Sequence, residues 1–408
     1  MSIVGVEVAS PEEAEAGGAS FRPAMIVVGI GGGGGNAVSH MARAHIDSVK
    51  TLCINTDAQA LNKTQADVKV QIGSKMTGGL GCGADPSKGK AAAEEDVDKI
   101  RDALIGNHII FITAGEGGGT GTGGAPVVAK VAKEMGILSI AIVTKPFSYE
   151  GKKRAEHAEQ GIKELAQYAD TLIVIPNDKL LKVLGKKVTV LNAFAEANDV
   201  LLKAVQGISG SLLNDGVINL DFNDLKRCME NGGNAIIGIG VGRGAERAQE
   251  AVQKAIVCPL LDDIDLKGAR SVFLNIEAPT NIGLDEMELI NNTVKDYADA
   301  NAEIITGIAY TSSPNDDISL DGAKGDSDIP EGEIRVTVIA TGVGRKGDGM
   351  AAVQPKVLEP SSTIIDIDAD ELIRDDSPFL QDGDTGFSPF SQEEQSLDSP
   401  AFFRKQAD

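Results

Sequence analysis

HIIFITAGEGGGTGTGGAPVVAKVAKEMG, residues 108–136, is the stretch of sequence that decides the fold. It opens with an apolar run of strand composition at 108–115 and closes with a predicted helix at 125–136. Between them, residues 117–124 consist only of glycine and threonine. Glycines let successive backbone N–H groups converge on phosphate oxygens, hydroxyls add donors, and a helix start carries partial positive charge. This pattern predicts a phosphate-binding loop.

Strands alternate with helices on both sides of this stretch. Strand-like runs precede it at 25–30, 51–57 and 68–73 and follow it at 137–147 and 171–177, with helices expected at about 90–105 and 151–168. Such alternation implies a parallel sheet covered on both faces, whose ligands bind at the carboxyl ends of the strands. The prediction is an α/β fold with a Rossmann-like parallel sheet and its glycine loops on one edge.

A second glycine segment, GIGGGG at 29–34, follows the strand at 25–30. Its GxGxxG spacing permits a dinucleotide site, in which Asp57 at the end of the next strand would hold a ribose. An ordinary glycine-rich turn is the plainer alternative. A nicotinamide-dependent oxidoreductase does not need the loop at 117–124, and no GxxxxGK[ST] motif is present. Two glycine segments on one edge of the sheet favour a single nucleotide that is bound from two sides.

A long helix predicted at 188–213 links this first domain, 23–187, to a second one. Leu191, Phe194, Asn198, Leu202 and Val205 recur in it at helical spacing. Strand-like runs at 234–242, 271–278, 302–310 and 333–342 and helices at about 245–257 and 284–298 predict a second α/β domain with a mixed sheet over 214–343. No phosphate-type loop as dense as the first occurs there.

The two ends of the chain lack hydrophobic periodicity. Residues 1–22 are predicted to be a disordered arm, and 344–397 a self-repelling acidic linker. The last residues, 398–408, read DSPAFFRKQAD and combine two aromatic residues with a basic pair. Composition leaves two possibilities open for them, a docking peptide or a frayed tail.

Charge and composition restrict the partners. The formal net charge is −22, which argues against nucleic acid and anionic lipid as direct partners. Four cysteines without CxxC spacing and only four histidines make a metal site or a disulfide framework improbable and fit a reducing cytoplasm. No signal peptide or membrane-spanning stretch is predicted, so any membrane contact would need a partner.

Two carboxylates follow the long helix in NLDFND, residues 219–224. The residues alone favour Asp221 as a helix N-cap and Asp224 as a stabiliser of the first helical turn. Carboxylates beside a triphosphate are unfavourable unless a metal or a catalytic requirement justifies them.

Several motifs together resemble those of the tubulin/FtsZ family. GGGTGTGG is similar to the family's signature loop, and GIGGGGGNAV, NTDAQAL, TKPFSYEGKKR, NDKLLKVLG, NAFAEANDV and NLDFNDL match family motifs in order and spacing. The resemblance runs from about residue 24 to 343 and resumes at 399–408. It implies a two-domain GTPase that binds GTP or GDP with Mg²⁺, assembles head to tail with copies of itself, and forms a scaffold for cell division.

The resemblance also implies roles for particular residues. Asp221 and Asp224, with Asn219 beside them, would enter the nucleotide pocket of the next subunit and position or polarise the attacking water. The nucleotide-binding residues that it implies are Gly31, Gly32, Gly33, Asn36, Gly118, Gly119, Thr120, Gly121, Thr122, Gly123, Glu150, Arg154, Asn177, Phe194, Asn198 and Asp199. Among these, Phe194 would stack on guanine while Asn198 or Asp199 reads its edge. Residues 398–408 would dock on membrane-tethering adaptors at the division site.

The sequence departs from the family pattern at a few positions. Glu116 precedes the signature loop where an apolar residue is usual, and Asp85 stands where Asn is common. A carboxylate at either place is expected to raise the metal requirement or slow turnover, which leaves a weakly hydrolysing structural paralogue as an alternative. Ser399 and Phe403 replace expected aliphatic residues, which we expect to weaken adaptor docking.

Overall fold

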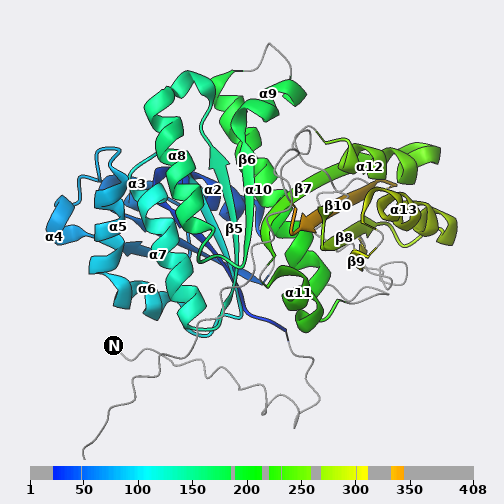
Figure 1. Cartoon of the computed structure of the whole chain (residues 1–408), viewed down its shortest axis with the longest axis horizontal. Helices are drawn as coiled ribbons and strands as arrows, with labels where there is room; N and C mark the ends of the chain where they lie inside the picture. Colours follow the sequence, from blue (N-terminus) through cyan, green and yellow to red (C-terminus); the bar gives the residue numbers. More distant parts are fainter. Residues whose placement is uncertain are drawn as a thin grey trace, which may run out of the picture. The chain divides into compact units, whose positions relative to one another are not determined.

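The computed structural model describes residues 22–46, 48–184, 189–213, 220–230, 232–258, 268–299, 301–310 and 332–343, with backbone alone for 181–184 and 213 (Figure 1). The predicted arm up to residue 21, the acidic linker at 344–397 and the terminal peptide at 398–408 lie outside the described residues, so their predictions stay untested.

The first half of the fold is a parallel sheet, as predicted. Its strands are β1 (Met25–Ile30), β2 (Val49–Asn55), β3 (Val68–Gln71), β4 (Ile109–Gly115), β5 (Leu138–Lys145) and β6 (Thr171–Pro176). They pair in the order β3-β2-β1-β4-β5-β6, all parallel. The carboxyl ends of these six strands therefore lie along one edge.

Helices cover both faces of this sheet. They are α2 (Gly31–Ala44), α3 (Ala58–Lys63), α4 (Ser74–Thr77), α5 (Pro86–Glu95), α6 (Val97–Leu104), α7 (Thr120–Glu134), α8 (Lys152–Leu165), α9 (Asn177–Leu184) and α10 (Val190–Leu213). Alternate residues of β1 enter different cores. Met25 and Val27 pack with residues of α2 and α10, whereas Ile26 and Val28 pack with residues of α6 and α7. Burial on both sides explains the continuous apolar runs of the strands.

Three helix boundaries differ from the sequence prediction. The helices after β1 and β4 begin at Gly31 and Thr120, so part of each glycine segment is helical rather than loop. The helix expected at 90–105 is divided into α5 and α6 at Asp96. The Asp96 side chain accepts a hydrogen bond from the Gly73 N–H at 2.8 Å and pairs with Lys99 at 2.8 Å, so it ties the break to a neighbouring loop.

The second half is a mixed sheet, again as predicted. The order continues β7 (Gly233–Gly242), β10 (Ile334–Thr341), β8 (Ser271–Ala278) and β9 (Glu303–Tyr310), with β10 antiparallel to both of its neighbours. Helices α11 (Phe222–Met229), α12 (Arg247–Ile256) and α13 (Leu284–Tyr297) accompany it. The two halves form one ten-stranded sheet because β6 pairs with β7, through Thr171–Gly233, Leu172–Asn234 and Ile173–Ala235.

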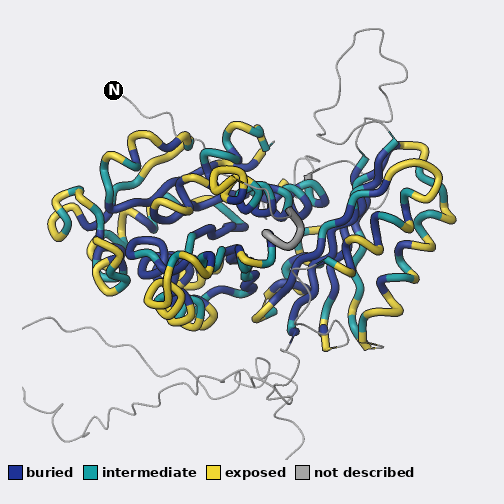
Figure 2. The backbone as a smooth tube through the Cα atoms, turned by 90° about the horizontal axis from the view of Figure 1, so that it is seen from above, coloured by how far each residue is buried: buried dark blue, intermediate teal, exposed yellow. Residues whose placement is uncertain are grey.

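Burial follows this layering. In Figure 2 the strands are mostly buried, while exposed residues gather on the outer helix surfaces and at the turns. None of the helices in the described ranges is long and apolar enough to cross a membrane.

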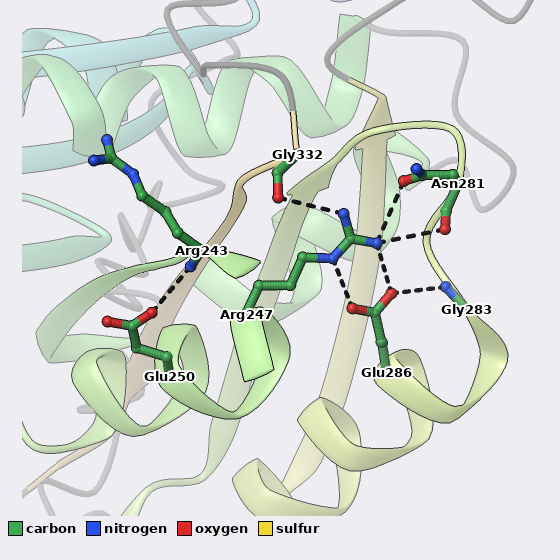
Figure 3. A network of polar contacts seen from close by, with 7 residues as sticks. All are labelled: Arg243, Arg247, Glu250, Asn281, Gly283, Glu286 and Gly332. Carbon is green, nitrogen blue, oxygen red and sulfur yellow. Dashed lines mark hydrogen bonds and ion pairs between the residues drawn. The ribbon is translucent and has the colours of Figure 1, made fainter. Parts of the chain in front are cut away.

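A half-buried ion pair joins α12 to α13 (Figure 3). Arg247 donates to both carboxylate oxygens of Glu286, at 2.7 and 2.8 Å, and its guanidinium also reaches the carbonyls of Asn281 and Gly332. The other Glu286 contact is the Gly283 N–H at the start of α13. This bidentate geometry fixes the two helices and the start of β10 relative to one another.

Replacing Arg247 by methionine is expected to lower the free energy of unfolding by about 1–3 kcal/mol, because the half-buried Glu286 would lose its charged hydrogen-bond partner. Urea denaturation of the full chain measures this loss. Lys254→Met is the matched control on the same helix, since its pair with Glu250 is exposed and should contribute at most about 1 kcal/mol. Equal losses in the two variants would contradict the assignment.

Candidate functional site

The two glycine segments touch each other at the carboxyl edge of the sheet. Gly31 has a φ of +71°, and a Cβ atom there would lie 2.7 Å from the Gly121 nitrogen. A Cβ on Gly33 would lie 3.0 Å from the backbone of Gly115. Only residues without a side chain allow this approach. The predicted meeting of both segments on one edge is confirmed.

The first turns of α2 and α7 have no side-chain caps. Their N-cap residues, Ile30 and Gly119, make no capping hydrogen bond, and neither first turn contains an acidic residue. Helices α3, α5 and α11 are capped by Asp57, Asp85 and Asp221, whereas α4, α6, α8 and α12 also lack a side-chain cap, so the close approach of the starts of α2 and α7 is what sets them apart. Two adjacent helix starts with uncapped N–H groups suit an anion with several oxygens.

Several residues of the glycine and threonine segment at 117–124 serve packing. A Cβ on Gly119 would lie 2.7 Å from the Cys82 Cβ, and one on Gly123 would lie 2.1 Å from the Pro86 carbonyl oxygen. These two glycines therefore allow α5 and the preceding loop to lie against α7. At Gly118 the nearest atom to a Cβ would be 4.0 Å away, so this residue faces open space.

Both threonine hydroxyls of the segment already have partners within the protein. The Thr120 hydroxyl lies 2.7 Å from the Thr56 hydroxyl, and the Thr122 hydroxyl accepts the Gly117 N–H at 2.8 Å. The two side chains are also buried. These contacts hold the loop in shape. The Thr122 hydroxyl accepts its bond and keeps its own proton for donation, so the phosphate contacts predicted for the two threonines stay predictions.

A second cluster of predicted residues lies where β5 and β6 end. Glu150 and Arg154 form an ion pair at 2.9 Å. Asn177 begins α9 and is buried, and its Oδ1 atom has no hydrogen-bond partner. A buried amide oxygen without a partner fits a ligand that donates a hydrogen bond there.

Residues on α10 complete this side of the site. Phe194 is 40% exposed, although it stands in a helix with a long buried face. Asn198 is half-buried, and the Asp199 carboxylate lies 2.6 Å from Lys203 and 3.7 Å from His40. Gly32, Gly33 and Asn36 are exposed at the start of α2.

Asp221 and Asp224 lie at the opposite edge of the sheet. Asp221 caps α11 by accepting the Asp224 N–H at 2.8 Å, and Asp224 pairs with Arg227 at 3.4 Å. The next residue, Phe222, contacts the ring of His108, which precedes the first residue of β4. The signature loop follows the last residue of that strand. Figure 1 shows α11 and α9 at opposite ends of β6.

The length of β4 separates Asp221 and Asp224 from the signature loop. Seven residues at ~3.3 Å each span roughly 20 Å, so one chain cannot bring these carboxylates to a phosphate on its own signature loop. The helix cap predicted from the residues alone is confirmed. Asn219 lies outside the described residues. Among the residues described, no group of three or more His, Cys, Asp or Glu side chains is placed to hold a metal ion.

The two departures from the family pattern have different surroundings. Asp85 is half-buried and accepts hydrogen bonds from the Ser87 hydroxyl and N–H, which lower the pKa of its carboxyl group. Glu116 is buried, and neither carboxyl oxygen has a hydrogen-bond partner. Its Oε2 atom would lie 2.6 Å from a Cβ on Gly161 of α8, so the carboxyl group packs between helices. Burial raises the pKa of Glu116 to about 8, and the nearby Thr122 hydroxyl offsets only part of this effect.

Sequence reasoning missed four residues around the site. Thr56, which directly follows β2, and Cys82, in the loop before α5, both contact the Thr120 hydroxyl. Phe147 and Tyr149 lie at the end of β5, and Phe147 contacts Phe194. A signal for the last two was present, since aromatic residues are only 4% of the chain and two fall within three positions at the predicted ligand edge.

Comparison with family models and known proteins agrees with this geometry. The model for the GTPase domain of the tubulin/FtsZ family matches residues 24–185, and the model for the C-terminal domain of the FtsZ family matches 233–321. A cell division protein FtsZ from Coxiella burnetii is 46% identical over 398 residues, covering 96% of this chain and 98% of the relative. The chain belongs to the FtsZ family.

Other FtsZ proteins are similar to this chain over most of its length. The FtsZ of Wigglesworthia glossinidia brevipalpis is 52% identical over 318 residues, 78% of this chain and 79% of the relative. A solved FtsZ dimer from M. jannaschii, described as empty, superposes with a TM-score of 0.72 at 38% identity and covers 85% of this chain and 99% of its own. Membership in the FtsZ family was predicted from the motifs and is confirmed.

Proposed function

We propose that this FtsZ-family protein is a GTPase of cell division that polymerises head to tail, and that each active site is completed by the neighbouring subunit. The observation that carries the proposal is the placement of two half-sites at opposite edges of one sheet. The uncapped starts of α2 and α7 lie at the carboxyl edge, while Asp221 and Asp224 lie at the amino edge. A second copy stacked along the strand direction brings the two half-sites together.

The nucleotide is assigned to the carboxyl edge. Its phosphates lie against the backbone N–H groups at Gly31, Gly32, Gly33 and at Gly118 to Gly123, with Asn36 beside them. The ribose lies near Glu150 and Arg154, and guanine stacks on Phe194 within reach of Asn177, Asn198 and Asp199. This placement is supported by the uncapped helix starts, the open space at Gly118 and the partnerless Oδ1 atom of Asn177.

Asp221 and Asp224 are assigned to catalysis in the pocket of the next subunit, with Asn219 beside them. A carboxylate there orients water, or accepts its proton, for in-line attack on the γ-phosphate. Mg²⁺ offsets the charge that the carboxylates add. In nucleotide sites Mg²⁺ usually keeps several waters and is bound by substrate phosphates together with one or two carboxylates.

Two other functions are less well supported. Asp57, the ribose ligand of the oxidoreductase alternative, already accepts the Ala60 N–H as the cap of α3. For the weakly hydrolysing paralogue, the two carboxylates that motivated it are differently placed: Asp85 caps α5 and Glu116 packs against α8. We further propose a cytoplasmic location at the division site and docking of residues 398–408 on membrane-tethering adaptors, without direct contact to nucleic acid or insertion into the membrane.

The test is GTP hydrolysis per subunit as a function of protein concentration, with Mg²⁺ present and polymer pelleted in parallel. We expect a rate near zero at low concentration that rises beyond the threshold at which pellets appear, because lone subunits hold only half-sites. A rate independent of concentration would place the complete site in one chain and contradict the proposal. Polymer with negligible turnover would favour the structural paralogue.

A further inference from the structure

Three aromatic side chains form a contact series beside the assigned base position, and we call them the aromatic triad: Phe147, Tyr149 and Phe194. Phe147 is 1% exposed and lies between the other two. It stacks on Tyr149 with ring centroids 5.1 Å apart and an interplanar angle of 12°. It meets Phe194 in a T-shaped contact at 5.2 Å and 87°. Both geometries are favoured ones for aromatic pairs.

The turn that carries Phe147 is held firmly. The Phe147 N–H donates to Glu150 Oε1 at 2.8 Å, while Glu150 Oε2 pairs with Arg154. Ser148 donates to the Asp178 carboxylate through its N–H at 3.0 Å and also through its hydroxyl. Phe147 therefore has little freedom to move, and the same turn presents the Glu150 that we assign to the ribose.

The Phe194 side chain is less constrained by its surroundings than that of Phe147. It is 40% exposed near the start of α10, and Leu191 in the preceding turn is 79% exposed. Within the triad, its ring contact is to Phe147. A half-exposed ring samples several rotamers unless a neighbour restricts it, and this freedom would have to be lost when a base stacks on it.

We propose that Phe147, itself braced by Tyr149, is a positioning residue that holds the Phe194 ring ready for guanine. The inference rests on the proposed function and deepens it, because it ties recognition of the base to the turn that holds the ribose. Phe147 does not touch the nucleotide and acts through Phe194. Its loss weakens base stacking and leaves the phosphate-binding helix starts in place.

A double-mutant cycle tests this. The dissociation constant of GDP is measured below the assembly threshold for the wild type, Phe147→Leu, Phe194→Leu and the double variant. We expect about a 2- to 10-fold weaker affinity for Phe147→Leu, the range for loss of one aromatic pair. The double variant should bind no more weakly than Phe194→Leu alone, because Phe147 acts only through that ring. Multiplicative losses, or unchanged affinity in Phe147→Leu, would overturn the proposal.

Tyr149 supplies a second measurement that does not depend on a buried substitution. The chain has no tryptophan and only four tyrosines, so tyrosine fluorescence can report on the triad. We expect GDP to change this fluorescence in the wild type and the change to disappear in Tyr149→Phe. Tyr149→Ala, at a 62% exposed position, should weaken GDP binding even if Phe147→Leu fails to fold.

Tyr297→Ala is the matched control, an exposed tyrosine on α13 that should leave GDP affinity unchanged. Full GDP affinity in Tyr149→Ala, or a fluorescence change that persists in Tyr149→Phe, would contradict a role for the triad. Failure of the wild type to bind GDP would instead refute the proposed function itself, so the two failures are distinguishable.

Discussion

Asp224→Ala is expected to lower GTP turnover at least ~100-fold, the contribution of a positioned general base, while GTP affinity stays within about twofold of the wild type. Asp224 lies at the edge of the sheet away from the glycine segments, so its loss should not disturb nucleotide binding to the same chain. Its partner Arg227 keeps an ion pair with Glu303 at 2.5 Å, so no unpaired charge is created. Phosphate release above the assembly threshold and GTP binding below it measure the two quantities.

Mixing two defective variants makes this test sharper. Gly118 faces open space and does not have a positive φ, so Gly118→Asp fits sterically while placing a carboxylate against the phosphates. It should abolish nucleotide binding and leave Asp224 intact. In a mixture, the nucleotide half-site of Asp224→Ala meets the intact carboxylate of Gly118→Asp, and turnover should return. A mixture no more active than its two components, or loss of GTP binding in Asp224→Ala, would refute the shared site.

Glu116→Met is expected to raise the free energy of unfolding by about 2–4 kcal/mol at pH 7.5 and by much less at pH 5. In the unfolded chain the Glu116 carboxyl ionises near its ordinary pKa of 4.5, whereas in the fold burial raises its pKa to about 8. Between these values the folded state binds more protons than the unfolded state, so stability falls as pH rises, by roughly 1.4 kcal/mol per unit. Below pH 4.5 both states are protonated and the effect is absent.

Urea denaturation of both proteins between pH 5 and 8.5 measures this difference. Glu156→Met is the control on α8, since its exposed pair with Lys152 should leave the pH dependence of stability unchanged. The same curve for the wild type and Glu116→Met would show that the Glu116 carboxyl has the same pKa in the folded and unfolded chain, which would contradict the prediction. Because Glu116 directly precedes the signature loop, we also expect the wild type, more than the variant, to lose GTP affinity toward alkaline pH.

The sequence predicted the sheet because its signals were local. Each parallel strand is an uninterrupted apolar run, and each glycine segment follows such a run, so order and edge could be inferred without contacts. The start of α7 was misplaced because glycine and threonine are poor helix formers, and packing against Pro86 and Cys82 decides their conformation. The break at Asp96 likewise depends on a hydrogen bond to Gly73, 23 residues away, which no local pattern contains.

The candidate site could be predicted in part. Composition pointed to the glycine segments, but it could not tell glycines that face open space, such as Gly118, from glycines that admit a neighbour, such as Gly123. The residues alone assigned Asp221 to a helix cap, which the structure confirms. The contact between Phe222 and His108 shows that this cap lies a full strand length from the glycine segments. It joins residues 114 positions apart in the chain. Only the fold supplies such a distance.

If each active site is shared between two subunits as proposed, the placement of the half-sites sets the number of complete sites in a filament. In an open chain of subunits joined in one direction, each junction makes one complete site, so a filament always has one fewer working site than it has subunits. A dimer therefore works at half the limiting rate per subunit, and each added subunit brings the average closer to that limit. At one end of the filament the terminal subunit binds nucleotide without carboxylates from a neighbour. At the other end the carboxylates of the terminal subunit have no nucleotide pocket to enter. Turnover per subunit thus becomes a measure of mean filament length.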